Sequence, residues 1–245
     1  MMVLILNAGI GHRMGDSTKI QPKCMTDLTD HETILSRQLD LIKRAGISKV
    51  VMTTGEFDQM IRDYVLSVAP DLEYTFVVNP LYDKTNYIYS IYLAKEYLDD
   101  NFVLMHGDLV FEDGILQNMM SGERSYMAVC GTQSLPKKDF KAVFKFPLSE
   151  KREDNSILKI GIDCFDNAYA AQPLYWLRRE DWRIWLAEIE RFCAEGQVNC
   201  YAENAFNEVS DKCLIYAYET GEKICGEVDT PEDFVKMRER LEKIK

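Results

Sequence analysis

In the first half of the chain, short apolar runs alternate with stretches in which apolar residues recur every three or four positions. The runs have the length of buried strands, and the recurring spacing is that of amphipathic helices. The predicted strands are residues 3–6, 49–53, 74–78 and 102–106, and the predicted helices are 34–45, ended by Gly46, 56–68 and 86–98. Strands that alternate with helices predict an α/β fold with a doubly wound, mostly parallel sheet.

The pattern changes after Val129. Residues 132–163 contain two prolines and a charged turn between two short segments, 142–146 and 157–162, which predict a β-hairpin. We expect this hairpin to project from the sheet as a lid over an acceptor site.

The C-terminal third predicts two further helices. Trp182 and Trp185 lie on one apolar face of a helix that Gly196 ends, and both are predicted to be core residues. A short strand, 225–228, precedes a helix that begins at Thr230 with a near capping box. We expect one domain over residues 1–245, with no internal repeat and no flexible linker.

A glycine-rich loop follows the first predicted strand. The sequence reads Leu4-Ile-Leu-Asn-Ala-Gly-Ile-Gly-His-Arg-Met-Gly15, and Pro22-Lys23 comes shortly after it. Glycines allow backbone N–H groups to approach an anion closely, and Arg13 and Lys23 would add positive charge. The loop is no Walker A loop, because Cys24 follows the lysine, and it is one residue too long for a dinucleotide fingerprint. It nevertheless indicates a nucleotide phosphate site.

Two carboxylates are candidates for a metal site near this loop. Asp108 follows the predicted strand 102–106, and Asp229 follows the strand 225–228 in the C-terminal part of the chain, residues 197–245. Ligands of doubly wound sheets lie beyond the carboxyl ends of the strands, where the glycine loop and Asp108 are expected to meet. Carboxylates at that edge suit Mg²⁺, which shares its coordination with phosphates.

Composition and charge exclude several kinds of binding partner. The formal charge of −11 and the lack of a basic run argue against nucleic acid and acidic membranes. No apolar run has the length of a membrane span, and Met1 leads into a strand without a basic leader, so we expect a cytoplasmic protein with no membrane partner. The seven scattered cysteines indicate reduced thiols. The oligomeric state is left open, a homodimer included.

The ordered motifs resemble those of a known superfamily. Leu-x-Ala-Gly-x-Gly-x-Arg-Met at 6–14, Pro22-Lys23, Gly107-Asp108 and Glu-Val-Asp-Thr-Pro-Glu-Asp at 227–233 are similar to the motifs of the sugar nucleotidyltransferases. Within that superfamily, the segment 79–93 resembles small bacterial cytidylyltransferases of the phosphocholine type. The resemblance spans the chain and implies a Rossmann-like sheet.

The resemblance also implies an activity and a set of roles. It implies Mg²⁺-dependent transfer of CMP from CTP to a small phosphorylated or phosphonate acceptor, with release of pyrophosphate. Arg13 would hold the β and γ phosphates, Lys23 would bridge the α-phosphate and the acceptor phosphate, and Asp108 and Asp229 would hold Mg²⁺. The residues implied for nucleotide binding are Leu6, Asn7, Ala8, Gly9, Gly11, His12, Asn79, Asn86, Ser90, His106 and Gly107.

The acceptor end departs from the choline-specific pattern. Choline-specific members enclose the quaternary ammonium in tryptophan and tyrosine side chains. Here Phe140 and Tyr201 are available, but Ala202 and Gly226 occupy positions where further aromatics are usual. The nearby acids Glu203, Glu208, Glu227 and Asp139 would instead pair with a primary ammonium, as in 2-aminoethylphosphonate or a phosphorylated amino acid derivative.

Two other functions remain open at this point. A sugar 1-phosphate nucleotidylyltransferase would share the nucleotide site and differ at the acceptor. A nucleotide-sensing protein would bind the nucleotide without transferring it.

Overall fold

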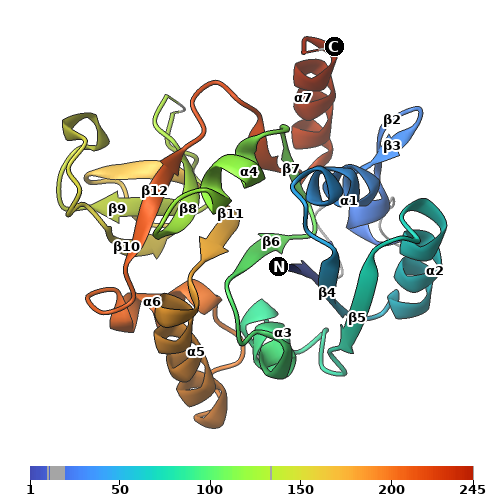
Figure 1. Cartoon of the computed structure of the whole chain (residues 1–245), viewed down its shortest axis with the longest axis horizontal. Helices are drawn as coiled ribbons and strands as arrows, with labels where there is room; N and C mark the ends of the chain where they lie inside the picture. The colour runs from blue at the N-terminus through green and yellow to red at the C-terminus, as the bar shows by residue number, and fades with distance from the viewer. Residues whose placement is uncertain (10, 12–19, 133, 245) are drawn as a thin grey trace.

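Within residues 1–9, 11, 20–132 and 134–244, which the computed structural model describes, nine strands form one sheet (Figure 1). Its order is β10-β9-β11-β6-β1-β4-β5, with β8 paired to β11 and β12 paired to β8. The strands are β1 (Met2–Asn7), β4 (Lys49–Thr54), β5 (Glu73–Val78), β6 (Phe102–His106), β8 (Ser125–Cys130), β9 (Lys141–Phe144), β10 (Ile157–Gly161), β11 (Ala168–Leu177) and β12 (Ile215–Glu219). Strands β5, β4, β1 and β6 run parallel, which confirms the predicted mostly parallel α/β sheet.

The antiparallel side of the sheet is organised by β11, which pairs with β6, β8 and β9. The register with β8 shifts between Ala171 and Tyr175, around Pro173, which has no N–H to donate to a ladder. The predicted hairpin exists as the antiparallel pair β9 and β10. It continues the main sheet through β11 and does not form a separate projection.

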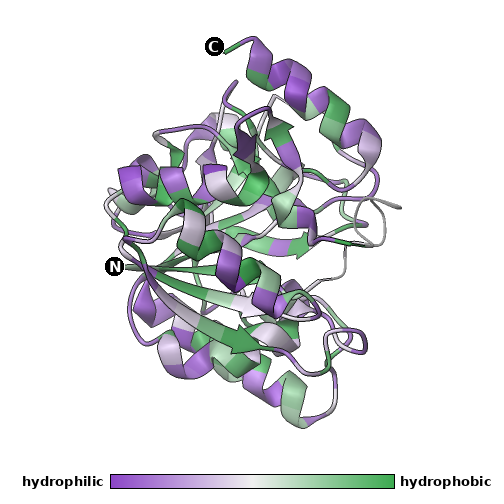
Figure 2. Ribbon diagram, turned by 90° about the vertical axis from the view of Figure 1, so that its right-hand side faces the viewer, coloured by the Kyte–Doolittle hydropathy of each residue, from purple (hydrophilic) through white to green (hydrophobic). Residues whose placement is uncertain are grey.

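Helices cover both faces of this sheet. One face carries α1 (Ile34–Arg44), α2 (Asp58–Val68) and α4 (Ile115–Met120), and the other carries α3 (Tyr87–Ala94), α5 (Arg179–Ala194) and α6 (Ala202–Val209). The alternation of side chains along β1 explains the two layers, because Leu4 packs in one core while Val3 and Ile5 pack in the other. Figure 2 shows the same arrangement, with largely apolar strands between helices that carry both polar and apolar residues. Trp182 and Trp185 are fully buried, as predicted.

A third, smaller core joins the C-terminal helix to the sheet. It is built from residues of α7 (Pro231–Glu242), β2 (Asp27–Thr29), β7 (Leu109–Phe111) and the start of α1, with Ile224 and Val228 on either side of β13 (Cys225–Glu227). Strand β3 (Glu32–Thr33) pairs with β2. Short 3-10 turns are η2 (Lys23–Met25), η3 (Lys95–Tyr97) and η4 (Leu148–Glu150). Helix α7 begins as predicted, with a complete capping box between Thr230 and Asp233.

The pairing of β13 with β7 determines where the C-terminal carboxylates lie. Glu227 is in register with Leu109, and the Val228 N–H donates to the Asp108 carbonyl oxygen at 3.0 Å. Residues 227–229 are therefore brought beside the end of β6, far away in sequence. None of the helices in the described ranges combines the length and apolar character needed to cross a membrane.

Candidate active site

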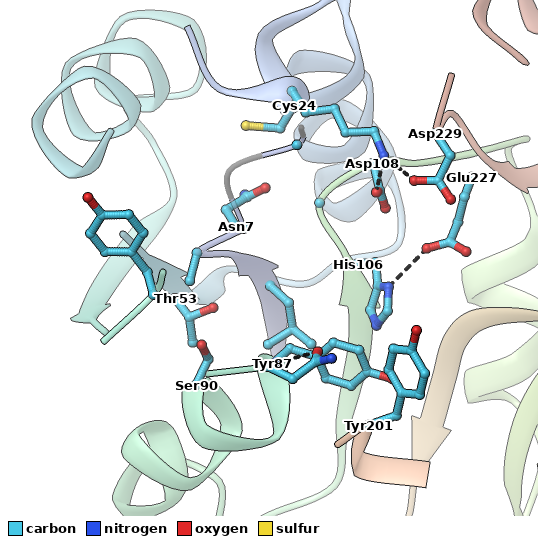
Figure 3. Close-up of a pocket in the computed structure, with 18 of the residues that line it drawn as sticks. Asn7, Cys24, Thr53, Tyr87, Ser90, His106, Asp108, Tyr201, Glu227 and Asp229 are labelled. Atoms are coloured by element: carbon cyan, nitrogen blue, oxygen red, sulfur yellow. Dashed lines mark hydrogen bonds and ion pairs between the residues drawn. The ribbon is translucent and has the colours of Figure 1, made fainter. Parts of the chain in front are cut away.

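A cavity of about 470 Å³ opens at the carboxyl ends of β1, β4 and β6 (Figure 3). Most of the residues predicted for the site line it: Leu6, Asn7, Ala8, Gly9, Gly11, Lys23, Asn79, Asn86, Ser90, His106, Gly107, Asp108, Phe140, Tyr201, Glu227 and Asp229. His12 and Arg13 lie outside the described residues. The fold thus gathers these segments at one edge of the sheet, where ligands of such sheets bind.

Lys23 joins the two predicted metal carboxylates. Its Nζ lies 2.5 Å from Asp108 Oδ2 and is also hydrogen-bonded to Asp229 Oδ1. The side chains of Lys23 and Asp229 are 10% exposed and that of Asp108 is 20% exposed, so little water surrounds the cluster.

The charges in this cluster stabilise one another. Burial opposes the ammonium of Lys23, but the two carboxylates outweigh it and raise its pKa. Burial also opposes ionisation of Asp108, yet the charge of Lys23 keeps the pKa of Asp108 below its usual value. Lys23 is therefore a fixed cation inside the cavity.

A histidine and a glutamate are hydrogen-bonded to each other beside this cluster. His106 Nδ1 lies 3.0 Å from Glu227 Oε1. Burial, together with the negative charge of Asp108, raises the pKa of Glu227 to about 7, although the hydrogen bond between Glu227 and His106 lowers it. Burial would lower the pKa of His106, but the hydrogen bond and charge of Glu227 raise it above the usual value.

The donors around Asp108 fit a divalent cation. Asp108 Oδ1 is buried and has no hydrogen-bond partner among the described residues, although the other carboxylate oxygen contacts Lys23. Ligand atoms of His106, Asp108 and Glu227 lie within 4.8 Å of one another. Carboxylate oxygens suit Mg²⁺, and an imidazole nitrogen is also accepted by transition metals. Asp108 is thus common to two donor sets, one with Asp229 and one with His106 and Glu227.

The opposite side of the cavity is neutral and polar. Asn7, Thr53 and Ser90 lie there, away from the acidic cluster (Figure 3). Asn7 Nδ2 and Thr53 Oγ1 are buried and have no hydrogen-bond partner within the described part of the chain. Because unpaired buried polar atoms are costly, this side is suited to a ligand that supplies hydrogen bonds.

The turn after β6 can only be built with glycine. A Cβ at position 107 would lie 1.6 Å from Asn7 Oδ1 and 2.9 Å from the Leu6 carbonyl oxygen. Gly11 has a φ of 72°, a conformation that favours glycine. Position 107 therefore favours glycine because Asn7 and Leu6 approach so closely, and position 11 favours it because of its positive φ.

Sequence reasoning missed several lining residues, among them Thr53, Tyr82, Thr85 and Tyr87. Thr53 and Tyr87 belong to a predicted strand and a predicted helix, where the pattern indicates packing. Tyr82 and Thr85 lie between two predicted elements, where the pattern of apolar residues assigns them no role. Cys24 also lines the cavity, but burial raises the pKa of its thiol to about 12, so it stays protonated and is a poor nucleophile.

Two predicted acceptor residues do not reach the cavity, and their prediction is corrected here. Glu203 is only 2% exposed and faces the interior, where Tyr87 and Tyr175 donate hydrogen bonds to it. Glu208 lies on the exposed side of the same helix. Five residues along an α-helix correspond to well over a quarter turn, so the two side chains point in different directions.

The chain is similar to a CMP-phosphonate synthase and to cytidylyltransferases. It is 31% identical over 116 residues to the CMP-5'-(3-aminopropyl)phosphonate synthase of Streptomyces rubellomurinus, which covers 47% of this chain and 18% of that protein. It is 27% identical over 135 residues to the CTP:phosphoglutamine cytidylyltransferase of Campylobacter jejuni, which covers 53% of this chain and 52% of that protein. The match therefore spans about half or less of the length of these two relatives.

A third relative matches over its whole length. The choline-phosphate cytidylyltransferase of Streptococcus pneumoniae is 22% identical over 251 residues, with 98% of both chains covered.

Solved structures share the fold. A CTP:phosphocholine cytidylyltransferase from Streptococcus pneumoniae has a TM-score of 0.77 at 19% identity, with 98% of each chain covered. A UDP-glucose pyrophosphorylase complexed with UDP-glucose has a TM-score of 0.80 at 15% identity, covering 100% of this chain and 99% of that one. At these identities the likeness concerns the fold alone.

The family assignment agrees with the predicted resemblance to nucleotidyltransferases. The MobA-like NTP transferase domain matches residues 3–199, which is most of the chain and includes the glycine loop, Lys23 and Asp108. The chain belongs to the family of MobA-like NTP transferase domains.

Proposed function

We propose that the protein is a cytidylyltransferase that transfers CMP from CTP to a small phosphorylated or phosphonate amine and releases pyrophosphate. The observation that carries this proposal is the buried contact of Lys23 with Asp108 and Asp229 inside the cavity. The similarity to enzymes named for CTP and for phosphonate or phosphate acceptors supports the choice of substrates.

The chain's own residues would act mainly through position and charge. An oxygen of the acceptor phosphate or phosphonate attacks the α-phosphorus of CTP, a new P–O bond forms, and the bond to the β-phosphate oxygen breaks. Lys23, which lines the cavity, would neutralise charge on the α-phosphate. Arg13, which the family resemblance implies for the β and γ phosphates, lies outside the described residues. The acceptor oxygen is already anionic, so the step needs no general base.

Asp108 and Asp229 are the residues that would hold Mg²⁺. The unpaired Oδ1 of Asp108 supports this assignment. When bound, Mg²⁺ would supply charge neutralisation and alignment to the phosphates.

The acceptor end is assigned to the aromatic and acidic side of the cavity. Phe140 packs edge-on against Tyr201 with ring centroids 5.1 Å apart, and both line the cavity together with Glu227. Aromatic faces and a carboxylate attract an ammonium group, which is why an amine-bearing acceptor is proposed.

A grid of nucleotides and acceptors tests this function. Pyrophosphate release is measured with CTP, UTP and dTTP, each with 2-aminoethylphosphonate, phosphocholine and glucose 1-phosphate. We expect turnover with CTP and an amine-bearing acceptor, and we expect chelation of divalent cations to reduce it by about 100-fold or more.

Other outcomes favour the alternatives. Turnover only with UTP or dTTP and glucose 1-phosphate would identify a sugar 1-phosphate nucleotidylyltransferase, a function consistent with the fold shared with UDP-glucose pyrophosphorylase. Binding of CTP without pyrophosphate release from any combination would favour a nucleotide sensor.

A further inference from the structure

Glu203 is a buried carboxylate held by tyrosine hydroxyl groups. It is 2% exposed, and the Tyr175 hydroxyl donates to its Oε1 at 2.7 Å, while the Tyr87 hydroxyl donates to its Oε2. Burial is the main cause, and the negative charge of Glu203 the second, that raises the pKa of each tyrosine well above the ordinary value. Both hydroxyl groups therefore stay protonated and donate hydrogen bonds. Among the described residues, no lysine or arginine forms a salt bridge with Glu203.

One of these tyrosines belongs to the wall of the active-site cavity. The Tyr87 ring lies 4.6 Å from the ring of His106 and 5.8 Å from that of Tyr201, measured between centroids. Figure 3 shows the three side chains gathered on the same side of the cavity as Glu227. Because the Tyr87 hydroxyl is hydrogen-bonded to Glu203, the orientation of the Tyr87 ring in this wall is fixed by a residue outside the cavity.

The buried charge affects what the wall attracts. A hydroxyl that donates to a carboxylate leaves more electron density on its ring, and the ring face then attracts a cation more strongly. In a poorly hydrated region the negative charge itself also acts across the ring with little screening. Glu227, in the cavity, contributes a second carboxylate on this side.

We propose that Glu203 is a positioning residue that makes the Tyr87 wall selective for acceptors carrying an ammonium group. This inference rests on the proposed function and adds a selectivity determinant that does not touch the acceptor. An acceptor with a neutral hydroxyl in place of the ammonium gains nothing from this charge.

Steady-state kinetics with two acceptors that differ only in this group tests the proposal. The acceptors are 2-aminoethylphosphonate and 2-hydroxyethylphosphonate, and the variants are Glu203→Gln and Tyr87→Phe. For both variants we expect the KM of the amine to rise about 10-fold, with kcat within about 2-fold of the wild type and the KM of the hydroxyl analogue nearly unchanged. Tyr87→Phe retains the bond between Glu203 and Tyr175, so it keeps the test available if Glu203→Gln folds poorly.

Glu208→Gln is the matched control, because it removes the same charge from the exposed side of the same helix. It is expected to leave both KM values unchanged. A general loss of structure would change kcat and the KM values of both acceptors together. An active wild type whose preference for the amine is unchanged in both variants would overturn the inference. No pyrophosphate release by the wild type with any acceptor would overturn the proposed function, and the inference with it.

Discussion

Replacing Lys23 with methionine is expected to lower kcat/KM for nucleotidyl transfer by about 10³-fold, because this side chain is a fixed cation in the cavity. Methionine keeps most of the length of the side chain but removes its charge and its hydrogen bonds to Asp108 and Asp229. Initial rates of pyrophosphate release at CTP concentrations below KM, with saturating acceptor, measure the effect. Lys159→Met is the control, because Lys159 is exposed on β10, and it should retain full activity.

The same substitution should also affect stability in a specific way. Without the ammonium, the carboxylates of Asp108 and Asp229 face each other in a poorly hydrated site, which costs up to about 3 kcal/mol of unfolding free energy. A divalent cation would replace part of the missing charge, so added Mg²⁺ should raise the melting temperature of the variant more than that of the wild type. Wild-type activity in Lys23→Met would contradict the role given to this residue.

Gly107→Ala is expected to abolish nucleotide binding and to destabilise the fold by about 2–3 kcal/mol. The added methyl group would lie 1.6 Å from Asn7 Oδ1 and 2.9 Å from the backbone oxygen of Leu6, so Asn7 must leave its place in the cavity. Urea denaturation and calorimetric titration with CTP measure the two effects. Gly9→Ala is the control for the denaturation measurement alone, since a Cβ at Gly9 meets nothing within 4 Å.

A second substitution separates the side-chain clash from the backbone clash. In the double variant Gly107→Ala with Asn7→Ala, the closest contact is removed while the contact with Leu6 remains. We expect the double variant to recover part of the stability that Gly107→Ala loses, as coupled neighbours do. Additive losses would show that Asn7 does not pack on Gly107 in this way.

Local sequence patterns predicted the parallel part of the sheet well. The strands around β1, the helices α1 and α2 and the capping box of α7 all follow from apolar periodicity and cap residues, which act within a few positions. β11 was not predicted, because it is buried along most of its length, lacks alternation and contains Pro173. Its three partner strands, β6, β8 and β9, come from other parts of the sequence and pair with it only in the folded sheet.

The candidate site shows the same division between local and distant information. Lys23, Asp108 and Asp229 were predicted from motif order, and the structure brings them together through the pairing of β13 with β7. The acidic pair Glu203 and Glu208 was assigned to the acceptor from charge alone. Only the orientation of α6 about its own axis shows that Glu203 is buried and Glu208 is exposed.

The central claim is that Asp108 and Asp229 hold a divalent cation against the nucleotide. Calorimetric titration with CTP tests it most directly, in the presence and absence of Mg²⁺, for the wild type and for Asp108→Asn and Asp229→Asn. If these two aspartates hold a cation against the nucleotide, Mg²⁺ should tighten CTP binding about 10-fold or more in the wild type and less than about 2-fold in either variant. Equal CTP affinity in all three proteins, unaffected by Mg²⁺, would contradict the account.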